Sequence, residues 1–302
     1  MHIRFFRRAA LTAACMLGVT AAGTSYSAQP EAGWSYRTSA GYFLSTETDF
    51  DNGGEFSSQH FFMGGSTEKM IGRDFSIGLG LNYTAVDYDF DGLALPLWDR
   101  ADFLTLSIPL SMPAGERGRV SLFGSIGSAS EQEADFDDGN LYSVIASYVY
   151  SFSKELSVGL GAGYTGGLED NSLFPFMMIR WQITEQLLLT NPFRPGPFGP
   201  AGLELSYRPN DRLDFAIGGV YRSLRFALAE DSSAAPSGYA EFEGIPVFLR
   251  VGWAAHPAVS MDAYLGVSLN GQLTIDDRDG HELSQDDYDP LPIIGLSISG
   301  RL

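Results

Sequence analysis

The chain alternates between apolar residues and small polar residues over many short stretches, of which 75–84, 156–165 and 259–268 are the clearest. In the second of these, Ser, Gly or Thr separates the apolar positions, which are Leu156, Val158, Leu160, Ala162 and Tyr164. A period of two with one apolar face predicts β-strands. The other face is small and polar, which is typical of the lumen of a membrane barrel whose apolar face contacts lipid.

The same pattern recurs to the end of the chain and predicts about fourteen strands. They cover 33–46, 57–69, 74–90, 101–112, 118–132, 140–152, 156–168, 172–183, 187–190, 201–208, 212–228, 240–253, 258–275 and 290–302. We expect an all-β fold, a single transmembrane antiparallel up-and-down β-barrel, because bacterial single-chain barrels have an even number of strands. The ninth strand is very short, so a twelve-stranded barrel is the alternative. Arg222-Ser223 interrupts the alternation in 212–228 and predicts a bulge.

The connections between these strands alternate in length. Every second one is a short turn, as at 69–73, 113–118, 153–155, 184–186, 209–211 and 254–258, whereas most of the others are long loops, at 47–56, 91–100, 133–139, 191–200, 229–239 and 276–289. Outer-membrane barrels have short periplasmic turns and long extracellular loops. Most Asp and Glu residues fall in or beside the long loops, and both lysines, Lys69 and Lys154, lie in short turns. A soluble β-sandwich has no reason to sort charge in this way.

The N-terminal residues have the pattern of a secretory signal peptide. Arg4, Arg7 and Arg8 precede an apolar run, 9–22, and Ser25-Tyr26-Ser27 gives a processing site before Ala28. We therefore expect residues 1–27 to be cleaved and residues 28–302 to form the barrel. Cys15, the only cysteine, lies in the leader, which leaves the mature chain without disulfides. The later sequence has no stretch that approaches the roughly 20 apolar residues of a spanning helix.

The signal peptide, the repeated amphipathic strands and the terminal strand together resemble Gram-negative outer-membrane β-barrel proteins. The terminal strand alternates Ile294, Leu296 and Ile298 with Gly or Ser, and the chain ends at Leu302, where such proteins usually have an aromatic residue. The resemblance covers the whole mature chain. It implies integral residence in the bacterial outer membrane, insertion by the barrel-assembly machinery, and contact with outer-membrane lipid and lipopolysaccharide.

Charged residues on the predicted lumen face are the first candidates for function. By strand parity they are Arg37, Arg180, Glu204, Arg208, Asp214, Arg222, Arg250, Asp262 and Arg301. Arginines inside a barrel either line a pore or pair with carboxylates to brace the wall. Because a buried guanidinium without a partner is costly, paired networks are the simpler expectation.

The acidic loops are the second candidate. Oxygen-rich segments could hold divalent cations such as Ca²⁺ or Mg²⁺ at the outer rim, through Asp87, Asp89, Asp91, Asp276, Asp277 and Asp279. Asp87 begins a stretch like a calcium-binding loop, but Trp98 occupies the position of its final glutamate. A solvated acidic surface is the simpler interpretation. No other cofactor is expected.

Two further features bear on function. The proline-rich loop 191–200 cannot continue a strand ladder, and it could narrow the mouth or form a stiff external cap. His60 follows Ser58 near the outer end of a strand, which permits an outer-membrane hydrolase as a minor alternative, although no nucleophile elbow is present. We expect no enzymatic activity.

The sequence favours a passive, porin-like channel for small solutes whose acidic mouth attracts cations. The main alternative is a closed structural or surface-interaction barrel without transport. The formal net charge of −18 argues against a nucleic-acid partner.

Overall fold

The computed structural model describes residues 33–301 except 73, 94–96 and 193–200. No helix in these residues is long and apolar enough to cross a membrane. The described residues form strands β1 (Trp34–Ser45), β2 (Thr48–Asp49), β3 (Glu55–Ile71), β4 (Phe75–Asp91), β5 (Arg100–Pro113), β6 (Gly118–Glu131), β7 (Asn140–Ser151), β8 (Leu156–Gly167), β9 (Asp170–Gln182), β10 (Leu187–Thr190), β11 (Gly202–Asn210), β12 (Leu213–Val220), β13 (Arg222–Ala227), β14 (Tyr239–His256), β15 (Val259–Asp276), β16 (Glu282–Tyr288) and β17 (Leu291–Arg301).

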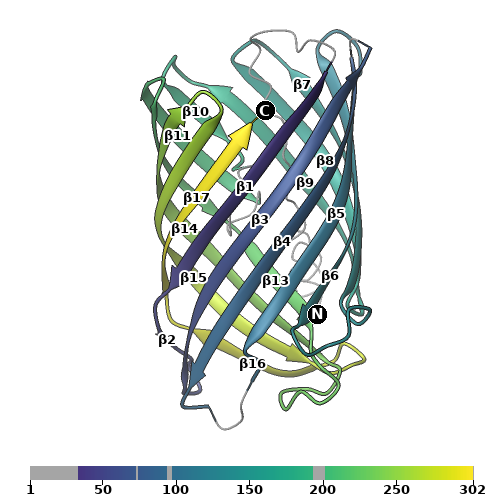
Figure 1. The fold of residues 1–302 in the computed structure, drawn as a ribbon, viewed down its shortest axis with the longest axis vertical. Coiled ribbons are helices and arrows are strands. Elements are labelled where there is room, and N and C mark those ends of the chain that lie inside the picture. Colours follow the sequence, from purple (N-terminus) through teal and green to yellow (C-terminus); the bar gives the residue numbers. More distant parts are fainter. Residues whose placement is uncertain (1–32, 73, 94–96, 193–200, 302) are drawn as a thin grey trace.

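These strands form one closed antiparallel barrel of fourteen strands (Figure 1). Closure comes from β1, which pairs with β17 on one side and with β3 on the other. The prediction of fourteen strands is confirmed, and the twelve-stranded alternative is wrong, because the short ninth strand is β10 and pairs with both β9 and β11. β2 and β16 are additional short strands at the long-loop end, which the sequence pattern did not predict.

The two ends of the barrel differ as the connections predicted. The six short turns named above lie at one end, uppermost in Figure 1, where β17 also finishes, whereas the short turn between Gly167 of β8 and Asp170 of β9 lies at the other end. At the other end β3, β4, β14 and β15 extend well beyond the remaining strands, and β2 and β16 lie beside them.

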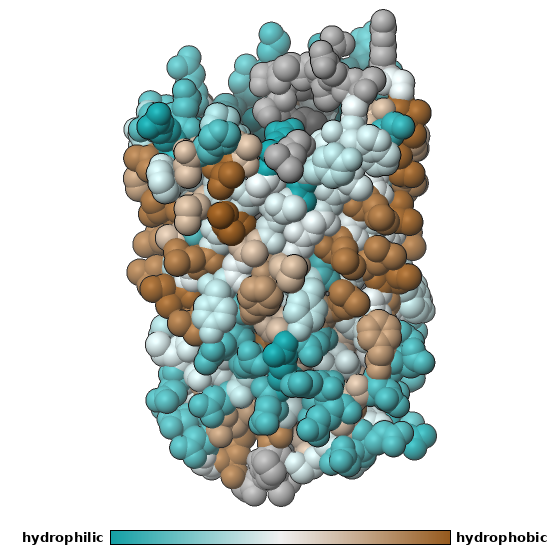
Figure 2. All heavy atoms as spheres, viewed as in Figure 1, coloured by the Kyte–Doolittle hydropathy of each residue, from teal (hydrophilic) through white to brown (hydrophobic). Residues whose placement is uncertain are grey.

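Large apolar side chains face outward over the middle of the barrel. Figure 2 shows them as a broad hydrophobic zone above a hydrophilic region at the long-loop end. Leu160 and Leu173 are each 68% exposed on this surface. Exposed aromatic residues lie towards the short turns, including Trp34, Trp181, Tyr207 and Trp253, and a second set lies towards the long loops, including Tyr42, Tyr142 and Tyr164. Two aromatic girdles that flank an apolar zone are the pattern of an outer-membrane barrel.

β12 and β13 separate where the sequence predicted a bulge. β12 lies between β11 and β14, and the chain breaks strand geometry at Tyr221. β13 remains paired with β14, but its other edge leaves the β11 side and reaches β6, where Ala227 pairs with Ser130. The long-loop end is therefore closed across the interior by β13, instead of continuing as a fourteen-stranded wall.

The inward face is richer in rings than the expected small and polar lumen. Phe43, Phe62, Phe248 and Tyr264 form one buried cluster with Val220 and Ile293. Phe123, Ile145 and Phe174 form another. Inward glycines give these rings their space, since a Cβ on Gly295 would lie 2.0 Å from the Phe43 ring and one on Gly163 would lie 2.2 Å from the Phe174 ring. The small residues of the alternating pattern thus accommodate rings from neighbouring strands.

Candidate functional site in the barrel interior

The interior changes in chemistry from the short-turn end to the long-loop end. Along β14 the inward positions include Arg250, Phe248, Gly244 and Phe242 in that order, and the inward face of β3 runs from Phe62 through His60 and Ser58 to Phe56. Each wall therefore presents a ring, then a small or polar stretch, then another ring. On β14, Arg250 lies between the first ring, Phe248, and the short-turn end.

A buried ionic cluster surrounds Arg250 on the short-turn side. Its guanidinium donates to Glu204 at 2.8 Å and 3.3 Å and to Asp262 at 2.8 Å, and it lies 3.4 Å from Asp214. Arg208 lies 3.6 Å from the other oxygen of Asp214. These five residues of the predicted lumen set thus lie together across β11, β12, β14 and β15. Their charges pair within the wall, as expected for side chains that brace it.

The remaining predicted lumen residues do not join this cluster. Arg37 of β1 lies 3.7 Å from Glu68, and its Cα pairs with that of Arg301, which is exposed at the end of β17. Arg180 is partly buried on β9, opposite Ser157 of β8. Arg222 lies nearer the long-loop end than this cluster, at the start of β13.

A small cavity lies between the level of Phe248 and the aromatic residues nearer the long-loop end. It has a volume of about 40 Å³, which is room for about three water molecules. Its polar lining consists of Ser45, Ser58, His60, Arg222 and Ser268, and rings that include Phe56, Phe242 and Tyr288 line the rest. A chain of hydrogen bonds runs along one side of the cavity. Ser45 Oγ lies 2.9 Å from Ser58 Oγ, Ser58 Oγ lies 3.1 Å from His60 Nε2, and Arg222 lies 3.3 Å from His60 Nδ1.

The order of this chain bears on the hydrolase alternative. A guanidinium has no acceptor, so His60 Nδ1 must accept the hydrogen bond from Arg222. A neutral imidazole then carries its proton on Nε2 and donates it to Ser58 Oγ. A serine nucleophile needs the reverse, a histidine nitrogen that accepts the serine proton. The Ser58–His60 pair is thus part of a structural hydrogen-bond chain and does not have the arrangement of a nucleophile with its base.

Aromatic side chains fill the interior between the cavity and the long-loop end. Trp98, Phe226 and Phe56 are at most 1% exposed. Trp98 packs edge-on against Phe226 with ring centroids 5.2 Å apart, and Phe56 lies 5.4 Å from Phe242. We call this group the outer aromatic cluster; its rings are Phe50, Phe56, Tyr88, Phe90, Trp98, Phe226, Phe242 and Tyr288. The sequence analysis did not predict this cluster, because it assigned Phe50, Phe56, Trp98 and Tyr288 to long loops and the other rings to the alternation of three separate strands.

The sequence analysis also missed a second ionic cluster, on the opposite face of β13. Arg225 donates to Asp276 at 2.6 Å and lies 3.3 Å from Glu241, and its guanidinium packs 5.0 Å from the centre of the Tyr239 ring. The prediction that Asp276 belongs to a cation-binding rim is therefore wrong. Its side chain is 2% exposed and neutralises a buried arginine instead.

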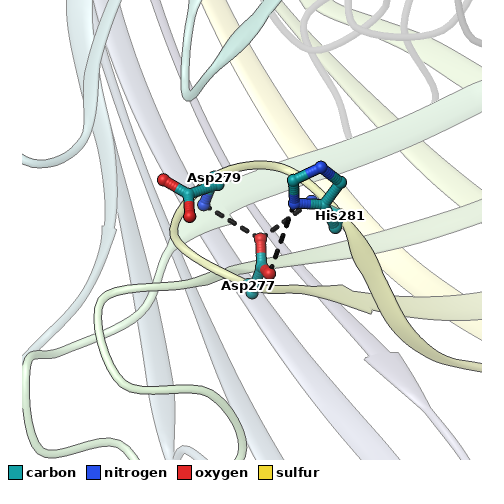
Figure 3. A group of neighbouring side chains, drawn as sticks. All are labelled: Asp277, Asp279 and His281. Carbon is teal, nitrogen blue, oxygen red and sulfur yellow. Dashed lines mark hydrogen bonds and ion pairs between the residues drawn. The ribbon is translucent and has the colours of Figure 1, made fainter.

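The other predicted rim residues lie on two separate surfaces. Asp89 and Asp91 are exposed on β4, and Asp87 lies 3.6 Å from Arg100. Asp277 and Asp279 belong to the loop between β15 and β16 (Figure 3). One oxygen from each of them and one nitrogen of His281 lie within 4.8 Å of one another.

Hydrogen bonds within this loop explain that proximity. The backbone N–H groups of His281 and Asp279 each donate to Asp277 Oδ1 at 2.9 Å, and the bond from His281 is the main reason that the pKa of Asp277 is lowered. Figure 3 shows Asp277 at the centre of the turn. The carboxylate thus shapes the turn, and whether this loop binds a divalent cation stays a prediction. The proline-rich segment falls mostly outside the described residues, since 193–200 are not among them.

The strand number, the closed antiparallel topology and the unequal ends are the architecture of an outer-membrane β-barrel. No protein-family model matches the sequence, and no curated protein matches it. Among solved structures, the Pseudomonas putida toluene transporter TodX is similar at 8% identity and a TM-score of 0.46, with 96% of this chain and 94% of that chain covered. The KdgM porin is similar at 9% identity and a TM-score of 0.32, with 86% and 97% covered. The translocator domain of the autotransporter NalP from Neisseria meningitidis is similar at 10% identity and a TM-score of 0.35, with 91% of each chain covered. At these identities the similarity concerns the fold alone.

Proposed function

We propose that the protein is an integral outer-membrane conduit for small solutes of largely apolar character, and that the outer aromatic cluster controls entry. The observation that carries this proposal is the ring-lined interior. Ring residues face inward at two successive levels, with the polar cavity between them. Rings and aliphatic groups favour apolar and aromatic solutes, for which ligand sites typically use many apolar contacts and a few polar groups.

The ionic clusters support a role for the wall in stability and not in selecting ions. Arg250 and Arg225 are both buried and paired with carboxylates. An arginine whose charge is balanced in this way contributes little net field to a passing ion. The acidic outer loops can still concentrate cations near the mouth, and divalent cations could there bridge to lipopolysaccharide. We keep this cation-attracting mouth as a separate and secondary part of the proposal.

Uptake of a hydrophobic dye by intact Gram-negative cells tests the proposal. Cells that express the wild-type protein should accumulate N-phenylnaphthylamine faster than cells with an empty vector. Trp98→Ala removes a ring that packs against Phe226 and should raise uptake further, because it opens the cluster. Leu160→Ala, on the lipid-facing surface, is the matched control and should leave uptake unchanged.

Conductance in planar bilayers separates the proposal from the main alternative. The purified wild-type barrel should show little ionic current, because rings and paired charges occupy the interior, and Trp98→Ala should show larger steps. A closed structural barrel would give neither dye uptake nor conductance in any of these variants. A salt-gradient reversal potential in the open variant then measures whether the acidic mouth favours cations.

A further inference from the structure

The hydroxyl group of Ser268 is buried against the cavity between the two ring levels. Ser268 lies on β15, is 5% exposed and lines the cavity. Its hydroxyl makes no hydrogen bond with any of the residues that the structure describes. Gly244 of the neighbouring β14 leaves the space beside it, since a Cβ on Gly244 would lie 2.5 Å from Ser268 Oγ. Buried hydroxyl groups almost always have a hydrogen-bond partner, so the cavity is suited to a ligand group that supplies one.

A second pair of hydroxyl groups lines the same cavity. His60 Nε2 donates to Ser58 Oγ, which lies 2.9 Å from Ser45 Oγ. A bond between the two serines uses only one of their two hydroxyl protons, so the other can be donated to a group in the cavity. Each oxygen also has lone pairs, which can accept a proton from such a group. The cavity therefore offers donors and acceptors together, as a hydroxyl group on a ligand requires.

The charges in the lining favour a neutral ligand group. Among the described residues that line the cavity, Arg222 and Glu243 are charged, and His60 is neutral in the hydrogen-bond order given above. A carboxylate in the cavity would lie near Glu243, and an ammonium group would lie near Arg222. Burial of a charged group is costly without a dedicated counter-charge, whereas a neutral hydroxyl group needs only its hydrogen bonds.

The remainder of the lining is largely apolar. Phe43 and Ile293 contribute to it, and Phe56, Phe242 and Tyr288 line it towards the long-loop end. The cavity has room for about three water molecules, so it can take a hydroxyl group and the first carbon atoms attached to it. The rest of a solute would then lie among the surrounding rings. A few polar groups within an apolar site are the usual arrangement for orienting a small ligand.

We propose that this cavity recognises the hydroxyl group of a small, neutral and otherwise apolar solute, such as a phenol. The solute hydroxyl hydrogen-bonds with Ser268 and with the Ser45–Ser58 pair, and its hydrocarbon part contacts the rings. A hydrocarbon without the hydroxyl group leaves these serines unpaired and binds less well, because unmade hydrogen bonds in a buried site reduce affinity. This deepens the proposed function and rests on it for passage through the barrel, whereas binding at the cavity can be measured alone.

Three fluorinated probes of similar size test the proposal: para-fluorophenol, para-fluorotoluene and para-fluorobenzoate. Each is titrated into the refolded barrel in detergent micelles, and saturable binding is followed by fluorine NMR. Protein-free micelles give the partition into detergent, which is subtracted. The wild-type barrel and Trp98→Ala, which opens the outer aromatic cluster, are both titrated, so that restricted entry does not hide the site.

Ser268→Ala removes the buried hydroxyl group, and Ser260→Ala is the matched control. Ser260 lies on the same strand, but its hydroxyl bonds with that of Ser299 at 2.8 Å and does not line the cavity. Each variant is made in both the wild-type and the Trp98→Ala background, and the heat-dependent shift of the folded band on a gel confirms that it has folded. Ser45→Ala repeats the test if Ser268→Ala does not refold.

We expect para-fluorophenol to bind roughly five to ten times more tightly than para-fluorotoluene, which is about the effect of one net hydrogen bond. Ser268→Ala should remove most of this preference without weakening the binding of para-fluorotoluene, and Ser260→Ala should keep it.

Equal affinity for the two probes, a preference that Ser268→Ala leaves unchanged, or no saturable binding in either background would overturn the proposal. Tighter binding of para-fluorobenzoate would also overturn it, in favour of an anion site. Dye uptake without the preference would leave a conduit that does not recognise the hydroxyl group. The preference without dye uptake would keep the site and refute the conduit.

Discussion

Removal of the Arg250 side-chain charge should destabilise the barrel strongly. Arg250→Met keeps a long unbranched side chain but leaves Glu204, Asp214 and Asp262 buried together without the guanidinium that lies among them. Loss of one partner of a buried ion pair costs about 3–5 kcal/mol. Three hydrogen bonds from the guanidinium lie at 2.8–3.3 Å, and charge-assisted bonds of this kind contribute about 1.5–3 kcal/mol each, so the upper part of that range is expected.

The assay is urea unfolding of the refolded protein in lipid vesicles, followed by tryptophan fluorescence and by the heat-dependent shift of the folded band on a gel. Arg250→Lys keeps the charge but not the forked geometry, and it should lose less. Arg250→Met combined with Glu204→Gln and Asp262→Asn also removes the charges of the two carboxylates that accept hydrogen bonds from Arg250, and it should recover most of the stability. A loss below about 1 kcal/mol in Arg250→Met, the size of a surface ion pair, would refute the reasoning. So would a triple variant that is no more stable than the single one.

Three further predictions follow from local contacts. The Asn191 side chain accepts from the Ile179 N–H at 2.8 Å and donates to Gly202 O at 2.9 Å. Asn191→Ala should cost about 1–3 kcal/mol for each buried backbone group left unpaired, measured by the same urea titration, and Asn191→Asp should cost less at the first group because it keeps an acceptor. Gly295→Ala should cost about 1–3 kcal/mol through displacement of the Phe43 ring, whereas Gly124→Ala, with nothing within 4 Å of its Cβ, should be neutral; equal effects would contradict the ring-packing explanation. Burial raises the pKa of Glu131, at the outer end of β6, so stability should fall as the pH rises from the unfolded to the folded pKa, and Glu131→Gln should flatten that part of the stability curve.

Much of the fold could be predicted from the sequence because a barrel is specified locally. Each strand carries its own period of two, and each connection shows its side of the membrane by length and charge. Even the four-residue β10 was predicted at its observed bounds, since Leu187–Thr190 lies between two turn-forming segments. The irregularity near Tyr221 was predicted as a bulge within one strand, from the interruption at Arg222-Ser223, but the separation into β12 and β13 was not predicted.

The candidate site could be predicted only in part. Parity placed Glu204 and Arg250 on the inward face, but it could not show that their side chains meet. They lie on β11 and β14, which are separated by β12, so their contact depends on the order of the strands in the barrel. Asp276 was assigned to the rim from the acidic composition of its loop and not from parity, and the structure buries it beside Arg225 instead. The pairing of Asp276 with Arg225 depends on the path of β13 across the interior to β6. The alternation of apolar and polar residues does not predict that path.

The sequence by itself determined the strands, their number, their lipid-facing side and the asymmetry of the two ends. These features depend on alternation and on turn residues, which act over a few positions of the chain. Only the tertiary structure decided that rings fill the interior and that β13 closes the outer end. Those features depend on which strand lies beside which, and on space that a glycine of one strand leaves for a ring of another.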